Sequence, residues 1–577
     1  MTINQAIDVK DATVRSVKRA RTADLRAVGE PFLWGLGGAL ALGVLMISGF
    51  LLMVFWNGAV TFWPRPVAAV TLSDGTVIAG ERSRAEDYRP SADQLRTLDP
   101  AVQQQVRRDG GYAVRTLYRT GNYDVYNEDF RWVPEYQISK VEYPSGMMVF
   151  ERLEWGLFIG RIKALSIDGS TMPGEQVSAA ELDRLHDAAR DRWSRILEIE
   201  RDEIGAVNHH INQDRLAIRR AVIRYGEESP EHKAAIAEAT ANAAELKKDY
   251  DALSAEAQAL RAEDAKYTIT LAEIGGAEKT LSLSAIVRMY AANDMSVFEK
   301  LGVYLSRWWE FLSDEPREAN TEGGVLPAIF GTFSMTLLLV VFVAPFGVIT
   351  ALYLREYAKQ GRLVSIVRIS VNNLAGVPSI VYGVFGLGFF AYILGGSIDQ
   401  LFYPERLPSP TFGTGGLLWS SLTLALLTVP VVIVATEEAL AAVPRSMREG
   451  SLACGASKWQ TIRNIVLPRA MPGIMTGLIL AMARGAGEVA PLMLVGVVKL
   501  APELPIDGFF PFIHLERSFM HLGFHIYDVG FQSRNSEAGK PMVFVTTMLL
   551  IALIAAMNVS AIIIRNRLRR KFAGSQF

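Results

Sequence analysis

Long apolar runs alternate with polar stretches along this chain, and the runs have the length of membrane-spanning helices. A helix needs roughly 20 mostly apolar residues to cross the hydrocarbon core of a bilayer. Five runs carry no charged residue: 31–64, 325–354, 369–398, 417–436 and 541–564. A sixth run, 470–498, contains Arg484 and Glu488. The pattern predicts six spans, one before a long polar stretch and five after it.

The polar stretch from 65 to 322 is predicted to be an α+β insertion. Residues 66–79 and 136–168 alternate apolar and polar positions around turn sequences, which is typical of short β-hairpins. Apolar residues then recur at helical spacing from 177 to 225, and a second helical segment follows at 231–263. We expect an antiparallel helical hairpin over 177–263 that projects about 50 Å. It is either a spacer or stabilising arm, or a docking arm for another subunit.

The composition agrees with a membrane protein that carries a sizeable polar part. Half of the 577 residues are hydrophobic, only 21% are charged, and the mean hydropathy is +0.19. The net charge of −1 excludes a broadly basic nucleic-acid-binding protein. The single cysteine, Cys454, excludes a disulfide framework and a cysteine-ligated metal cluster. We expect an all-α polytopic membrane protein with six transmembrane helices, to which the external α+β insertion is added.

Lysine and arginine residues between the runs predict the orientation, because short basic segments stay in the cytoplasm. With six spans, four basic segments fall on one side: 10–26, 355–368, 445–469 and 565–571. Both termini are then cytoplasmic and the insertion is periplasmic. The predicted domains are a cytoplasmic segment at 1–30, transmembrane helix 1 at 31–64, the periplasmic insertion at 65–322, a membrane domain at 323–565 and a basic cytoplasmic tail at 566–577.

The segment between the fourth and fifth runs carries the most informative motif. Residues 449–468 read EGSLACGASKWQTIRNIVLP. They resemble the pattern Glu-Ala-Ala, three residues, Gly, nine residues, Ile-x-Leu-Pro, which marks the permease subunits of ABC importers and their ATPase-coupling loop. The positions in register are Glu449, Gly455, Ile465, Leu467 and Pro468. Gly450 and Ser451 replace the two alanines. We expect two short helices in a coupling loop at 437–470, with a sharp bend at Gly455, which lacks a Cβ atom.

Further segments resemble one branch of that family, the PstA-type permease subunits of phosphate ABC transporters. These segments are Gly331-Thr332, Pro345 with Gly347, 351–358, 373–383 and 476–494. The resemblance covers about 320–570 and implies the fold of type I ABC importer permeases. It does not extend to the insertion. Members of this branch often carry an arginine shortly before the acidic pair Glu437-Glu438. Ala435 stands at that position here, so one positive charge that the resemblance implies for the substrate path is in question.

The resemblance also implies partners. These are a second permease subunit that is PstC-like (or a second copy), a dimer of PstB-like ATPase subunits and a periplasmic PstS-like phosphate-binding protein, in the lipid bilayer of a bacterial inner membrane. The chain has no G-x-x-x-x-G-K-[ST] phosphate loop, since Gly539-Lys540-Pro541 lacks the upstream glycine and the Ser/Thr. ATP and Mg²⁺ are therefore expected at the partner ATPase. This chain is expected to have no catalytic residue and to bind no cofactor, metal or nucleic acid.

Arg484 and Glu488 are the candidate residues of the substrate path. They are four residues apart, which places them on one face of a helix. Charges inside a span are costly and indicate a pathway by default. Arginine suits phosphate because its planar fork donates two parallel hydrogen bonds. The alternative is a mutual salt bridge that only holds the fifth span to its neighbours. Under either interpretation, Gly485 and Gly487 favour close helix approach.

Other interpretations stay open at this point. His514, His521 and His525 lie near Asp528 in sequence, and His521 and His525 could hold a metal at helical spacing, but a polar segment at the outer interface explains them better. A permease for another oxyanion fits as well, because an arginine fork binds any tetrahedral oxyanion. A transmembrane sensor with an external helical domain is a further alternative. Its usual cytoplasmic output domain is missing here, since the cytoplasmic segments are short.

Overall fold

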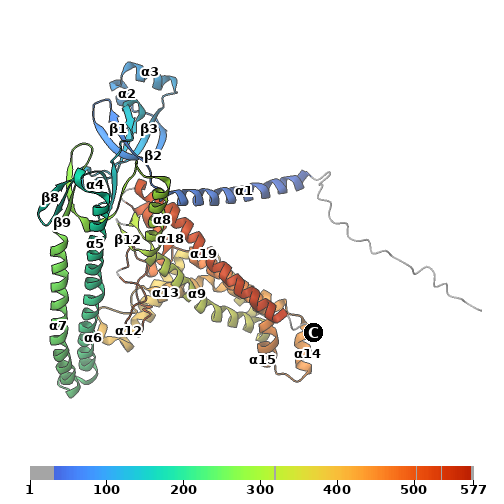
Figure 1. The fold of residues 1–577 in the computed structure, drawn as a ribbon. Coiled ribbons are helices and arrows are strands. Elements are labelled where there is room, and N and C mark those ends of the chain that lie inside the picture. The colour runs from blue at the N-terminus through green and yellow to red at the C-terminus, as the bar shows by residue number, and fades with distance from the viewer. Residues whose placement is uncertain (1–30, 318–319, 502, 534–535, 574–577) are drawn as a thin grey trace, which may run out of the picture. The chain divides into compact units, whose positions relative to one another are not determined.

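The computed structural model describes residues 31–317, 320–501, 503–533 and 536–573 (Figure 1). The expected segment 1–30, with its six basic residues, and the end of the tail at 574–577 lie outside the described residues. The chain divides into two units, residues 1–56 and residues 57–577. The first unit contains most of α1 (Pro31–Val60), an apolar helix of 30 residues and about 45 Å.

Six helices of the described chain are long and apolar enough to span a membrane, as predicted. They cover Trp34–Val60, Leu326–Tyr357, Ser379–Phe402, Leu417–Ala441, Lys458–Gly487 and Ser536–Arg570. The third begins at Ser379 instead of residue 369. Residues 362–374 form a separate helix, α10 (Arg362–Leu374), because Pro378 disfavours a helical conformation in the residue before it.

The other helices after residue 325 belong to the bundle and its connections. They are α9 (Leu326–Leu352), η6 (Tyr353–Tyr357), α11 (Ser379–Phe385), η7 (Gly386–Gly395), α12 (Gly396–Phe402), η8 (Pro404–Arg406), α13 (Leu417–Ala441), α14 (Arg445–Ala453), α15 (Lys458–Thr461), η9 (Ile462–Val466), α16 (Leu467–Gly487), α17 (Leu492–Val495), α18 (Leu522–Tyr527), η10 (Asp528–Gln532) and α19 (Ser536–Ala573). The helices α9 and α13 run in the same direction. Ser421 donates to the Met335 carbonyl, and about three turns later in both helices Gly347 faces Val432.

Small residues bring α13 and α16 together. A Cβ atom on Gly477 would lie 2.5 Å from the Cβ atom of Ala435, and one on Gly473 would lie 2.5 Å from that of Ala439. Helices in membranes pack closely where such small residues face each other. Ala435 is therefore a packing residue. The alanine at this position belongs to a close helix contact, at a place where members of the family often carry an arginine.

The inserted domain contains two antiparallel sheets, so the all-α classification is correct only for the membrane part. The first sheet has the order β4-β3-β2-β1-β5. Its segment of chain comprises β1 (Val67–Leu72), β2 (Val77–Tyr88), α2 (Ala92–Thr97), α3 (Pro100–Arg108), β3 (Ala113–Arg119), α4 (Tyr123–Tyr126), β4 (Phe130–Pro134), η1 (Glu135–Gln137) and β5 (Ile138–Glu142).

The second sheet has the order β10-β9-β7-β6-β11, with β8 paired to β7. Its elements are β6 (Met148–Arg152), β7 (Leu157–Ile167), β8 (Ser170–Pro173), η2 (Gly174–Gln176), β9 (Tyr267–Ala272), β10 (Glu278–Ser282), η4 (Leu283–Ala285) and β11 (Ile286–Ala291). The two sheets share a core in which Val67 and Ala79 pack against Val149 and Ile159.

Both segments contain a hairpin, but the second one turns at a different place. The strands β1 and β2 pair around residues 73–75, as predicted. In the segment 136–168, β6 and β7 form the hairpin around residues 153–156. The expected turn at 143–146 is wrong, because β5 pairs with β1 and not with β6. Asn293 and Asp294 bind the intervening backbone at Pro144 and Gly146, which holds it as a crossover between the sheets.

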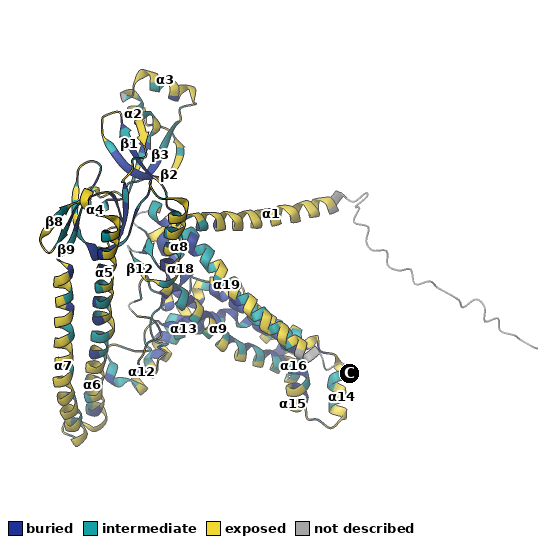
Figure 2. Cartoon of the chain, in the orientation of Figure 1, coloured by how far each residue is buried: buried dark blue, intermediate teal, exposed yellow. Residues whose placement is uncertain are grey.

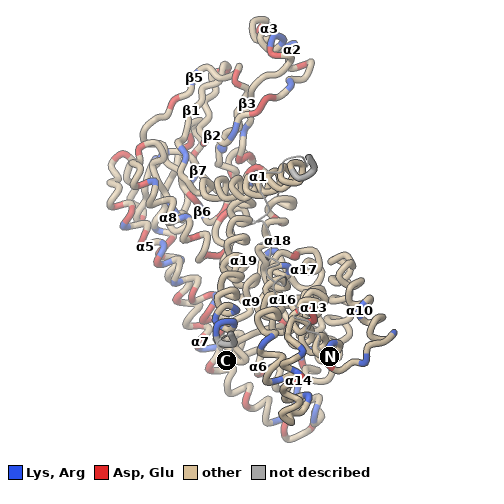
Figure 3. Tube along the Cα trace, turned by 90° about the vertical axis from the view of Figure 1, so that its right-hand side faces the viewer, with Lys and Arg blue, Asp and Glu red and all other residues tan. Residues whose placement is uncertain are grey.

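The predicted helical hairpin is present and forms a long arm, defined here as residues 179–264. It consists of α5 (Ala179–Leu197), the π-helical η3 (Glu198–Glu203), α6 (Ile204–Tyr225) and α7 (Pro230–Asp264). At its base, Leu182 and Leu185 of α5 belong to the core of the second sheet. Most of the remaining surface is exposed (Figure 2) and carries interspersed charges (Figure 3).

The arm returns to the bundle, in contrast to the expected free projection. Arg220 of α6 donates hydrogen bonds of 3.0 and 2.8 Å to Glu405 of η8. The ring of His209 stacks on Phe509 with 4.1 Å between ring centroids. Burial alone would raise the pKa of Glu405. The hydrogen bonds from Arg220 and the charge of Arg406 outweigh burial and hold this pKa below its usual range.

Ion pairs fasten the inserted domain to the helix that leads into the bundle. The connecting helix α8 (Val297–Ser313) is followed by the short strands β12 (Pro316–Arg317) and β13 (Glu322–Gly323). Arg307 of α8 donates to Glu151 of β6 at 2.7 Å. Burial raises the pKa of Glu151, but Arg307 and Arg288 outweigh that effect and keep it lowered, so its charge is retained at this junction.

Candidate functional site

The fifth span ends earlier than the apolar run that predicted it. Helix α16 stops at Gly487, Glu488 is extended with φ −81° and ψ 132°, and a short helix, α17, follows from Leu492. Pro491 accounts for the break, because it lacks a backbone N–H and disfavours helical conformation in the residue before it. The helix predicted over 470–498 is therefore interrupted between its two charged residues and α17.

The break lies near the middle of the bundle. Gly485 packs directly on Leu339, and a Cβ atom at this glycine would overlap the leucine side chain. Leu339 is midway between Leu326 and Leu352, the two ends of α9. The prediction of close helix approach is thus correct for Gly485. It is wrong for Gly487, where a Cβ atom would meet nothing within 4 Å.

Arg484 and Glu488 are brought together at this break. The Nε atom of Arg484 lies 3.6 Å from Oε1 of Glu488, and the two side chains are 38% and 24% exposed. They do not share a helix face, since Glu488 follows the last helical residue. Within the described part of the chain, the guanidinium group of Arg484 donates no hydrogen bond, so its planar fork stays open to another acceptor.

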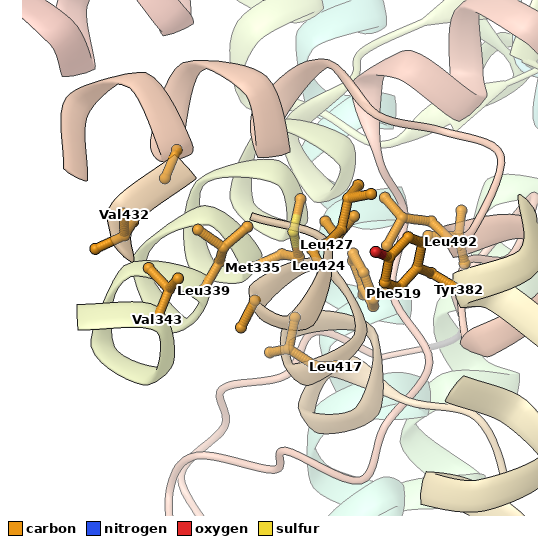
Figure 4. Close-up of a cluster of buried hydrophobic side chains, with 13 residues drawn as sticks. Met335, Leu339, Val343, Tyr382, Leu417, Leu424, Leu427, Val432, Leu492 and Phe519 are labelled. Atoms are coloured by element: carbon orange, nitrogen blue, oxygen red, sulfur yellow. The ribbon is translucent and has the colours of Figure 1, made fainter. Parts of the chain in front are cut away.

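Beyond the break, irregular chain and short helices fill the space between the spans. Leu492, Val497 and Phe519 join a buried cluster with Met335 and Leu424 of the long helices (Figure 4). Irregular backbone at membrane depth is tolerated only where protein buries it or where it lines a water-filled cavity. The buried cluster covers this irregular chain within the bundle, and the arginine fork beside it is partly exposed.

Tyr382 of α11 is a residue that sequence reasoning missed. It lies close enough to Arg484 for an electrostatic interaction, and its hydroxyl donates to the Leu374 carbonyl at 2.7 Å. It belongs to the same buried cluster as Leu492. Only its place in the segment 373–383, which resembles phosphate permeases, pointed to this region.

The expected coupling loop contains two short helices, α14 and α15, joined at Gly455. Gly455 has φ +83°, a left-handed conformation that residues with a Cβ atom rarely adopt. Ser457 and Gln460 form a capping box that starts α15. The hydroxyls of Ser451 and Thr461 are 2.9 Å apart and hold the two helices together. The small side chain of Ser451 supplies one side of this contact.

The motif residues differ in exposure. Glu449 and Gly455 are exposed, whereas Ile465, Leu467 and Pro468 are half-buried where the loop leads into α16. Leu452 and Trp459 also expose large apolar surfaces, 48% and 54%, and sequence reasoning missed them. Arg448 anchors the loop by a 3.0 Å ion pair to Glu356. A loop with this surface can bind a partner through apolar contacts around the bend.

The three histidines between α17 and η10 have different surroundings. No group of three or more His, Cys, Asp or Glu side chains suited to a metal was found among the described residues. His521 and His525 are buried, and His514 is held between Asp507 and Glu516 at 2.9 and 3.2 Å. Burial raises the pKa of Asp507, but the Phe509 N–H, Arg517 and His514 outweigh it and lower that pKa.

Comparison with known proteins decides the family. Residues 343–572 match the family described as "Binding-protein-dependent transport system inner membrane component". The chain is 34% identical over 261 residues to "Phosphate transport system permease protein PstA 1" of Mycobacterium tuberculosis (strain CDC 1551 / Oshkosh), which is 45% of this chain and 76% of that protein. The chain belongs to the PstA-type family of ABC importer permeases. It is a membrane subunit, a kind of protein without an ATPase site of its own.

Other similarities cover the same half of this permease. It is 35% identical over 204 residues to "Probable ABC transporter permease protein YqgH" of Bacillus subtilis (strain 168), which is 34% of this chain and 62% of that relative, less than two thirds of its length. A solved structure of the MetNI methionine ABC transporter matches with 21% identity and a TM-score of 0.31. That match covers 42% of this chain and 94% of the other.

Proposed function

We propose that this permease forms half of the membrane pathway of an ATP-driven importer of inorganic phosphate, with Arg484 and Glu488 in the path. The observation that carries the proposal is the open arginine fork at the break of α16, in a chain whose relatives include named phosphate permeases. A planar guanidinium group that stays charged and donates two parallel hydrogen bonds suits a tetrahedral oxyanion.

Glu488 gives this site a resting state. When no anion is present, its carboxylate at 3.6 Å partly neutralises Arg484. An arriving phosphate ion then exchanges one anionic partner of the guanidinium group for another. A charged side chain in the membrane has a high free-energy cost unless it has a partner. This exchange gives Arg484 an anionic partner both before and after phosphate binds. Glu488 also weakens anion binding by its like charge, which favours release.

The proposal includes the subunits that supply energy and substrate. The exposed surface at Glu449, Leu452, Gly455 and Trp459 is proposed to contact a separate ATPase subunit, which would bind ATP and Mg²⁺. A PstC-like second permease would complete the pathway, and a PstS-like binding protein would deliver phosphate. Both termini would be cytoplasmic and the inserted domain periplasmic. The basic residues near α14 and in the tail support this orientation.

Transport measurements distinguish phosphate from another oxyanion. The complex, purified with its partner subunits and reconstituted in liposomes, should take up labelled phosphate only with ATP and the phosphate-loaded binding protein. Sulfate at equal concentration should compete weakly. If a sulfate-loaded binding protein stimulates ATP hydrolysis and the phosphate-loaded protein does not, the phosphate assignment is wrong. If the assembled complex takes up neither anion and no loaded binding protein stimulates ATP hydrolysis, the sensor alternative would be favoured.

A further inference from the structure

Helix α8 carries a stripe of exposed apolar side chains that no element described above covers. Phe298, Leu301, Leu305, Trp309 and Leu312 recur at spacings of three and four residues, which places them on one helix face. Phe298 is 85% exposed and Trp309 is 74% exposed. A stripe of large side chains with this exposure indicates an interaction surface.

The opposite face of α8 is firmly attached to the protein. Arg307 donates to Glu151 at 2.7 Å, and the Tyr304 hydroxyl donates to the Ala59 carbonyl at 2.9 Å. Phe311 is buried in a cluster with Val325 and Ala328. The helix therefore cannot rotate to hide its exposed stripe without breaking these contacts, and the stripe is a fixed feature of the surface.

The height of α8 along the bundle is set by the ends of the spans that it contacts. Its aromatic residues pack on Phe62, with ring centroids 5.1 Å from Trp308 and 5.2 Å from Phe311. Phe62 directly follows the apolar helix that ends at Val60. The same cluster contains Ala328 in the first turn of α9 and Met542 near the start of α19. Helix α8 thus lies where three spans end, on the side of the inserted domain.

We propose that α8 is an interfacial helix whose stripe inserts into the outer leaflet of the membrane. The ends of α9 and α19, which meet in this cluster, mark the plane at which lipid headgroups begin. An amphipathic helix at that plane buries its apolar face roughly 5–10 Å into the headgroup and acyl boundary. Tryptophan is enriched at this depth, and Trp309 lies on the stripe. The inserted stripe would then adjoin the apolar surfaces that the neighbouring spans present to lipid.

The contact has a consequence for the inserted domain. Because α8 is tied to β6 by Arg307 and Glu151, its insertion would fix the height of both sheets above the bilayer. This inference does not depend on which solute the permease transports. It concerns a segment outside the family match at 343–572.

The test is site-directed fluorescence in the assembled complex. Cysteines replace Phe298 or Leu305, in a background with Cys454→Ser because the native cysteine is exposed. Each is labelled with an environment-sensitive dye, and the complex is placed in lipid nanodiscs. Val141→Cys is the matched control, because Val141 of β5 is an exposed apolar residue far from the bundle in sequence.

We expect blue-shifted emission from the labels at 298 and 305, and quenching by lipids that carry a nitroxide. A nitroxide close to the headgroup should quench more than one at the chain end. The label at 141 should respond only to a water-soluble quencher. Labels at 298 and 305 that respond mainly to the water-soluble quencher would overturn the proposal. Protection from both quenchers would overturn it too, because a protein partner would then cover the stripe.

Discussion

Arg484 and Glu488 are close together but only weakly tied. Their nearest N···O distance is 3.6 Å and both side chains are partly exposed. A pair with this geometry contributes about 1 kcal/mol or less to stability. Each single variant leaves the other charge without its partner, so uptake must be normalised to the amount of assembled complex before a loss of transport is assigned to the path.

The first prediction concerns the shape of the cation. Arg484→Lys keeps the charge but loses the bidentate fork, so it should transport almost as poorly as Arg484→Gln. A lost charge-assisted hydrogen bond costs about 1.5–3 kcal/mol, which corresponds to roughly 10- to 100-fold slower uptake. The measurement is uptake of labelled phosphate, normalised to the amount of assembled complex, in cells without other phosphate importers.

The double variant Arg484→Gln with Glu488→Gln separates the two roles of the pair. If the residues only neutralise each other, replacing both should restore uptake, because neither charge is left alone. Robust uptake by this variant would remove Arg484 from the path. Continued failure, with normal amounts of complex in the membrane, is the outcome that we expect.

Gly455 supports a second prediction. Its φ of +83° is a conformation that costs an ordinary residue roughly 1–2 kcal/mol, and a β-branched residue is stiffer still. In Gly455→Val the bend should be lost, and phosphate uptake should fall although ATP hydrolysis continues. Gly450→Ala is the control, since Gly450 is helical and a Cβ atom there meets nothing within 4 Å. Normal uptake by Gly455→Val would count against the proposed role of the loop.

Single residues with unusual chemistry were predictable from the sequence, but their neighbours were not. Arg484 and Glu488 stand out because a charge within an apolar run is rare. Tyr382 is about 100 positions earlier in the chain, so only the packing of α11 on the break brings it near Arg484. Leu452 and Trp459 look like ordinary core residues in sequence, and only the surface of the folded loop reveals them.

At the scale of elements, the arm divides into a structural base and a removable end. Leu182, Leu185 and Ala189 belong to the core of the second sheet. Arg195 and Glu256 are paired at 3.0 Å where the two halves of the arm meet. A deletion over the full predicted hairpin at 177–263 would therefore damage the sheet. The end of the arm, with its exposed surfaces, can be shortened without that damage.

The third prediction uses this division. Replacing residues 205–251 by a short glycine-rich turn should preserve assembly and leave substantial substrate-stimulated uptake, if the arm is a spacer. The measurement compares uptake and ATP hydrolysis with those of the full chain. Arg220→Gln, which breaks only the contact to Glu405, is the milder control. A complete loss of uptake with normal assembly would favour the docking-arm alternative.

Periodicity predicted helices better than it predicted strand pairing. The two arm helices follow from spacings within one segment, and their break follows from Gly226 and Pro230. Pairing of β5 with β1 and of β6 with β11 joins segments that are far apart in sequence. A turn sequence such as that at 143–146 indicates a change of direction, but it does not determine which strands meet afterwards.

The orientation of the whole molecule is the subject of the fourth prediction. In intact cells, an impermeant thiol reagent should label Glu228→Cys at the end of the arm and should not label Cys454 in the coupling loop. Both positions are exposed in the structure, so the side of the membrane decides the difference. Labelling of both after permeabilisation is the control. Labelling of Cys454 alone in intact cells would overturn the six-span orientation.

The early end of α16 gives the two sides of the membrane different mechanical properties. From the coupling loop to Gly487 this part of the bundle is a continuous rod, joined to α13 through Ala435 and Gly477. Beyond Glu488 the same column consists of α17 and irregular chain. A gate made of such chain can open by changes at a few backbone dihedrals, whereas a helical gate must tilt as one body. Under the proposed function, loading from the inserted-domain side would be a local rearrangement of this chain. Release on the other side would instead require a rigid displacement of α16, driven from α14 and α15.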